Sequence, residues 1–172
     1  MPDTNIAELN ELDRDRFVAV LGGVYEESPW VARGAYADQP FESVTDVATA
    51  LEAVVRDASH ERRLELLRAH PDLGEQTEMT DASAAEQSSA GLDQLRPELY
   101  EEFQRLNDLY RDRFGFPFIM AVKNESPEAI RAAMEQRVEQ SEQEEFETAL
   151  SEVHKIARLR LDDIVDSSVT RD

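Results

Sequence analysis

Apolar residues recur at helical spacing along almost the whole chain, and this pattern limits the possible folds more than any other feature. In the clearest case they follow one another at steps of four, three, four and four: Leu99, Phe103, Leu106, Tyr110 and Phe114. These steps place the side chains on one face of an α-helix. No segment shows the alternation of apolar and polar residues that marks a half-buried strand. The sequence therefore predicts an all-α fold, a single-domain helical bundle of about seven to nine helices.

Residues typical of helix ends mark several expected boundaries. Ser126 followed by Pro127 fits an N-cap with proline at the first helical position. Ile6, Leu9 and Leu12 share one helical face and predict the first helix. A similar pattern towards the C-terminus predicts a long last helix.

One apolar stretch, FGFPFIMAV at residues 114–122, does not fit a helix because Gly115 and Pro117 interrupt it. Nothing else in the chain resembles a strand that could pair with it. We expect an extended segment buried by the surrounding helices, whose backbone N–H and C=O groups need partners. Such a segment could hydrogen-bond a flat polar ligand. A merely hydrophobic connector is the alternative that the pattern leaves open.

Length and composition predict a soluble, cytoplasmic protein. The 172 residues suit one domain over residues 1–172, with a loose tail at about 167–172. The chain has no cysteine, which removes disulfides and thiolate chemistry. Its first residues lack the basic and apolar regions of a signal peptide. No apolar run reaches the ~18 residues that a membrane span needs.

The net charge is −20, from 38 acidic and 18 basic residues. Such a surface repels nucleic acid and anionic membranes, so neither is an expected partner. A DNA mimic or an acidic docking face is one interpretation of the charge. The acids are spread along the whole chain, which favours a solvated surface adapted to high intracellular salt.

A histidine stands where a helix must stop. The segment LLRAHPDLG, residues 66–74, ends a leucine-containing helix at His70, which Pro71 pushes towards an extended conformation. A lone histidine is often a surface or satisfied core residue. The proline after it holds the imidazole at a helix end instead of along a packed face, which favours a functional role.

The next predicted helix carries three polar residues on one face. Thr80 or Asp81 can cap this helix, and Ser83, Glu86 and Gln87 stand at i, i+3 and i+4. That face bears a hydroxyl, a carboxylate and a carboxamide. A plain solvent-exposed face is the alternative.

Near the C-terminus, Arg160 borders the apolar stripe of the last helix, beside Leu161. A partly buried guanidinium in so acidic a chain needs an anionic partner or an anionic ligand. The three histidines have no metal-ligand spacing, and no glycine-rich phosphate loop occurs. We therefore expect neither a metal nor a cofactor.

Five fragments occur in an order typical of one family: GGVYEESPWVARGA, LLRAHPDLG, SAAEQSSAGL, LNDLYRDRFGFPFIMAVKN and IARLRLDDIV. Together they closely resemble the 2-oxo-4-hydroxy-4-carboxy-5-ureidoimidazoline (OHCU) decarboxylases, over about residues 9–165. The resemblance implies an all-helical, cofactor-free and often dimeric enzyme. Its reaction would give (S)-allantoin and carbon dioxide at the end of the urate-to-allantoin route.

The resemblance also implies site residues. The family's catalytic histidine falls on His70, and its Ser-x-x-Glu-Gln motif falls on Ser83, Glu86 and Gln87. The implied ligand-lining positions are Phe118, Ile119, Met120, Ala121, Val122 and Arg160. One departure is local, since Leu73-Gly74-Glu75 stands where the family commonly reads Leu-Ala-Gly.

In the mechanism we expect, His70 protonates the carbon after carbon dioxide leaves, while Glu86 orients or activates the substrate. Pro71 would pack beside the substrate ring. Two other classes stay open. One is a hydrolase of a related ureide that uses Glu86 to activate water, and the other is a non-enzymatic acidic helical adaptor.

Overall fold

The computed structural model describes residues 4–74 and 80–166, and this part of the chain is mostly helical, as predicted. The predicted tail at 167–172 and Glu75 lie outside the described residues. The longer helices are α2 (Arg14–Leu21), α4 (Val44–Arg56), α5 (His60–Arg68), α6 (Asp81–Ser89), α7 (Pro97–Phe114), α8 (Pro127–Arg137) and α9 (Glu142–Ile164). The shorter elements are β1 (Thr4–Asn5), α1 (Ile6–Leu9), α3 (Trp30–Ala35), η1 (Tyr36–Asp38), η2 (Leu92–Gln94) and β2 (Val165–Asp166).

The chain forms two compact units. The first unit combines residues 1–66 with residues 154–172, and the second contains residues 67–153. The chain passes from one unit to the other within α5 and again within α9. The single domain expected over residues 1–172 stays a prediction.

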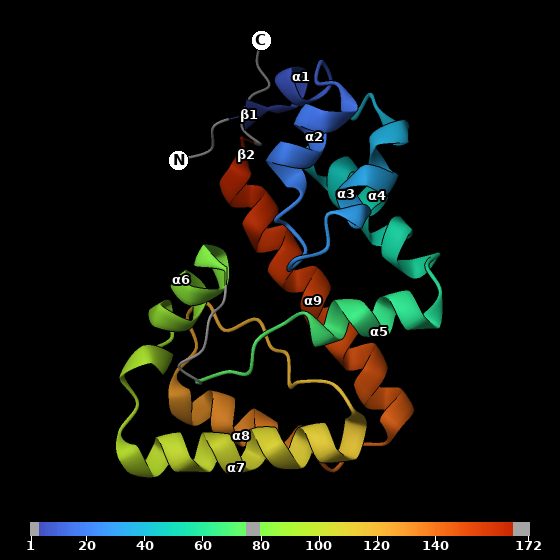
Figure 1. The fold of residues 1–172 in the computed structure, drawn as a ribbon. Coiled ribbons are helices and arrows are strands. Elements are labelled where there is room, and N and C mark those ends of the chain that lie inside the picture. The colour runs from blue at the N-terminus through green and yellow to red at the C-terminus, as the bar shows by residue number, and fades with distance from the viewer. Residues whose placement is uncertain (1–3, 75–79, 167–172) are drawn as a thin grey trace. The chain divides into compact units, whose positions relative to one another are not determined.

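The first unit is closed by a short parallel pairing of β1 with β2, in which Thr4 lies opposite Val165 (Figure 1). The sequence did not predict these strands, because two residues are too few to show an alternating pattern. Helices α3 and α4 pack closely, since Gly34 leaves room for Val54. A Cβ atom on Gly34 would lie 2.9 Å from the nearest Val54 methyl carbon.

The first predicted helix is shorter than expected. Helix α1 ends at Leu9, and Leu12 lies in the turn before α2. The physical reason is a second helix start, because the Asp13 side chain accepts a hydrogen bond from the Arg16 N–H. The Ser126 cap is confirmed, since its hydroxyl accepts a hydrogen bond from the Ala129 N–H at the start of α8.

The second unit is built on α7, which lies alongside α8 (Figure 1). Gly115 ends α7 with a φ of 81°, a left-handed conformation that favours glycine. The segment that follows has no regular structure, and Phe116, Phe118, Ile119 and Val122 are buried. The buried extended segment is therefore confirmed. No helix in the described ranges is both long enough and apolar enough to cross a membrane.

Candidate functional site

His70 lies directly after the last turn of α5. Its N–H donates to the Leu67 carbonyl at 3.3 Å, and its side chain is buried, with 7% exposed. Pro71 ends the helix here because it has no N–H and restricts the residue before it. The expected stop at a histidine is thus present.

Helix α6 buries two of the three polar residues on its predicted polar face. Thr80 caps it by accepting a hydrogen bond from the Ser83 N–H at 3.2 Å. Ser83 and Gln87 are buried and Glu86 is half-buried, whereas the alanines between them are exposed. The alternative of a plain solvent-exposed face is therefore wrong. A hydroxyl and a carboxamide are buried where packing alone would favour apolar side chains.

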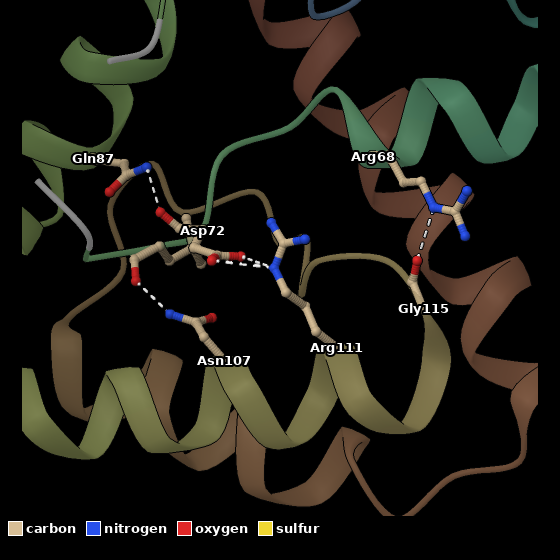
Figure 2. Close-up of polar contacts among 7 residues, drawn as sticks. Arg68, Asp72, Gln87, Asn107, Arg111 and Gly115 are labelled. Carbon is tan, nitrogen blue, oxygen red and sulfur yellow. Dashed lines mark hydrogen bonds and ion pairs between the residues drawn. The ribbon is translucent and has the colours of Figure 1, made fainter. Parts of the chain in front are cut away.

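The Gln87 carboxamide connects α6 to the loop after His70 (Figure 2). Its Oε1 accepts the Gly74 N–H at 2.9 Å, and its Nε2 donates to the Asp72 carbonyl at 3.4 Å. Gly74 has a φ of 81°, and a Cβ atom there would lie 3.0 Å from Leu95. Glycine at this departure from the family pattern thus fits a left-handed turn in close contact. The second unit brings the His70 loop and the polar face of α6 together.

Sequence reasoning missed two contacts of this loop with α7. The Asp72 carboxylate pairs with Arg111, and Asn107 donates to the Leu73 carbonyl (Figure 2). The available signal was Asn107 itself, a polar residue between Leu106 and Tyr110 on the apolar stripe of the helix. A buried polar residue on such a stripe indicates a specific hydrogen bond.

Side chains satisfy part of the backbone of the extended segment at residues 118–122. The Ile119 carbonyl accepts a hydrogen bond from Arg137 at 2.7 Å, and the Ala121 N–H donates to Glu152 at 2.9 Å. Within the described ranges, the Met120 backbone makes no hydrogen bond. This arrangement agrees with the expectation that the segment needs partners beyond regular secondary structure.

Arg137 belongs to a buried network below this segment. It pairs with Glu145, which also accepts a hydrogen bond from the Tyr110 hydroxyl at 2.5 Å. Burial, and after it the hydrogen bond to Glu145, raise the pKa of Tyr110. Tyr110 therefore stays neutral, and its hydroxyl donates a hydrogen bond to the Glu145 carboxylate.

Arg160 lies in the first unit, where it has an anionic partner as expected. It pairs with Glu26 at 3.0 Å and donates to the Gly23 carbonyl at 3.1 Å. Arg160 and Glu26 are both buried, with 6% and 1% exposed. That Arg160 joins His70 in one site stays a prediction. The described residues contain no cluster of three acidic or histidine side chains that could hold a metal ion.

Comparison with known proteins gives consistent matches over nearly the whole chain. The family model described as OHCU decarboxylase matches residues 10–162. A 2-oxo-4-hydroxy-4-carboxy-5-ureidoimidazoline decarboxylase from Haloferax volcanii is 60% identical, over 94% of this chain and 96% of that protein. One from Halalkalicoccus jeotgali is 57% identical, over 95% and 93% of the two chains.

The fold is also similar to that of a solved structure. A crystal structure of (S)-allantoin synthase superposes with a TM-score of 0.78 at 35% identity. The match covers 94% of this chain and 54% of that chain, so the present chain spans about half the length of the solved protein.

Proposed function

The chain belongs to the OHCU decarboxylase family, and on that premise we propose how its residues remove carbon dioxide from the ureidoimidazoline acid to give (S)-allantoin. The protein is a carboxy-lyase of urate degradation. The observation that carries the assignment of the site is the buried polar face of α6, joined through Gln87 to the loop of His70. Neither the hydrolase nor the adaptor alternative is favoured by the family match.

The chemistry needs little beyond placement of charge and a proton. Loss of carbon dioxide leaves an electron pair on the ring carbon, which the neighbouring carbon–nitrogen double bond of the ring takes up as an enamine-like system. The protein then has to orient the substrate, stabilise the charge and deliver a proton to one face of the ring.

In this proposal the His70 imidazole protonates the ring carbon, because an imidazole can act as either a general acid or a general base. Glu86 accepts a hydrogen bond from the substrate hydroxyl or ring N–H and orients or activates it. The half-buried position of Glu86, on the same helix face as two buried polar side chains, supports this role.

The remaining residues of the proposal bind the substrate. Ser83 and Gln87 hold the ureido and ring amides, Pro71 packs beside the ring, and Arg160 pairs with a carbonyl or anionic oxygen. Backbone groups of the segment at 118–122 bind the ring edge, which fits the Met120 backbone having no hydrogen bond within the described part of the chain. A homodimer and a cytoplasmic location stay predictions.

The test replaces the proposed proton donor. Uricase and hydroxyisourate hydrolase supply fresh substrate in high salt, and circular dichroism measures the excess of one allantoin enantiomer. The unmodified protein should form (S)-allantoin faster than the substrate decays spontaneously to both enantiomers. His70→Asn should melt normally and lose the stereospecific product, while His60→Asn, at an exposed histidine, should remain active. Near-normal turnover by His70→Asn would remove this residue from the mechanism.

A further inference from the structure

The segment that carries His70 has two contacts with α7 and a third with Gly115, the C-cap of that helix (Figure 2). The contacts are Arg68 Nε to the Gly115 carbonyl at 2.9 Å, Arg111 Nε to the Asp72 carboxylate at 3.0 Å, and Asn107 Nδ2 to the Leu73 carbonyl at 2.9 Å. All three lie within the second unit.

Two of the three points lie on α7 itself, and the third is its C-cap. Asn107 and Arg111 are four residues apart, so they lie on one face of the helix, separated by a rise of about 6 Å. Gly115 is the residue directly after the helix. His70 stands between the contact made by Arg68 and the contact made by Asp72. The chain after His70 is therefore held against α7, and the chain before it is held at the C-terminal end of that helix.

We infer that Asn107 and Arg111 are positioning residues for His70, which act through the loop and not on the substrate. The inference rests on the proposed function, in which His70 delivers a proton to one face of a ring. That task requires placement of the imidazole to within about 0.5 Å, which a loop without fixed contacts does not provide. A displacement of about 1 Å can cost a factor of about 100 in rate.

Asn107 is difficult to explain by stability alone. It is fully buried on the apolar face of α7, and its Oδ1 has no hydrogen-bond partner within the described residues. A buried acceptor without a partner destabilises a fold, so packing by itself would favour leucine here. The contact that Asn107 does make is the hydrogen bond to the Leu73 carbonyl in the His70 loop.

Arg111 allows the cleaner experiment. Its side chain is 44% exposed, whereas the Asp72 side chain is only 10% exposed. Arg111 is itself partly exposed, and glutamine keeps an N–H donor that can reach the Asp72 carboxylate, so Arg111→Gln should fold with a moderate loss of stability. The substitution removes the charge that fixes Asp72, two residues after His70.

The experiment measures kcat, KM and melting temperature for Arg111→Gln, Arg111→Lys and Asn107→Leu, with the coupled substrate supply. The control is Arg105→Gln, which changes an exposed arginine of α7 that pairs with Glu102. We expect Arg111→Gln and Asn107→Leu to lower kcat about 10- to 100-fold with KM nearly unchanged. Arg111→Lys should recover most of the rate, and the control should match the unmodified protein.

A double variant separates positioning from other roles. In the His70→Asn background, Arg111→Gln should cause no further loss of rate, because it acts through the imidazole that is already absent. The inference would be overturned if Arg111→Gln lowered the rate by the same factor in both backgrounds. A full rate in the single variant Arg111→Gln would also overturn it. An unmodified protein without activity would instead reject the proposed function. If Asn107→Leu fails to fold, the Arg111 series decides alone.

Discussion

At the scale of single residues, His154 shows how burial sets a protonation state. Its Nδ1 lies 2.7 Å from the Tyr25 hydroxyl oxygen in the first unit. Burial lowers the pKa of His154; the Glu52 carboxylate raises it by less, and Arg56 lowers it further. Burial also raises the pKa of Tyr25, so a neutral phenol can donate to a neutral imidazole.

This shift predicts how stability depends on pH. The unfolded chain takes up a proton on His154 near pH ~6.5, whereas the folded chain does so only at a lower pH. The free energy of unfolding should therefore fall as the pH drops below ~6.5 and should not change on this account above it.

Melting temperatures at pH 7.5 and 5.5, in constant high salt, check the pH prediction. The melting temperature of His154→Gln should fall less between pH 7.5 and 5.5 than that of the unmodified protein. His60→Gln, at an exposed histidine, should keep the whole decrease. Equal pH dependence in the two variants would contradict a role for His154.

At the scale of elements, one buried cluster joins three helices of the second unit. Arg137 of α8 pairs with Glu145 of α9, and Tyr110 of α7 donates to the same carboxylate. Glu145 is fully buried and Arg137 is 8% exposed. Arg137 also donates to the Ile119 carbonyl, so the cluster supports the extended segment as well as the helices.

Removing one charge of this pair should be costly. Glu145→Gln leaves the Arg137 guanidinium buried without its anion, which we expect to lower the free energy of unfolding by about 3–5 kcal/mol. The double change Arg137→Met with Glu145→Leu should recover most of this loss, because well-packed apolar residues can replace a buried pair.

Urea unfolding at fixed salt measures these differences. Recovery in the double variant should stay incomplete, since the Ile119 carbonyl loses its donor. Glu145→Gln with the stability of the unmodified protein would show that the pair does not hold the three helices together.

At the scale of the whole molecule, the net charge of −20 is the dominant property. Repulsion among the acidic side chains opposes folding in dilute buffer, where the screening length exceeds the spacing between surface charges. That length falls from about 10 Å at 0.1 M salt to about 3 Å at 1 M. Adaptation to high salt is thus a prediction from the charge.

Helicity should be lost in dilute buffer and restored in molar potassium chloride, as followed by far-ultraviolet circular dichroism. Sucrose in dilute buffer serves as the control, because it favours the folded state without screening charge. Sucrose should shift the helicity without changing its dependence on salt, and a melt that ignores ionic strength would contradict the charge argument.

Much of the helical fold could be predicted from the sequence, because helices depend on neighbours three or four residues away. The spacing along α7, the Ser126 cap and the break at Gly115 are all local signals. The end of α5 just before His70 follows from Pro71 for the same reason. The prediction that Leu12 belongs to the first helix was wrong, because Asp13 caps the start of a second helix.

The motifs for His70, Ser83, Glu86 and Gln87, and through them the family, were also visible in the sequence. Only the tertiary structure decided which face of α6 is buried and what that face contacts. Asp72 pairs with Arg111, which is 39 positions away in the sequence, and the Leu73 carbonyl accepts a hydrogen bond from Asn107, which is 34 positions away. Such contacts depend on how helices pack, which no local spacing encodes. Residues close together in the sequence determine the helices, whereas the surroundings of the His70 imidazole are set by residues that only the tertiary fold brings near it.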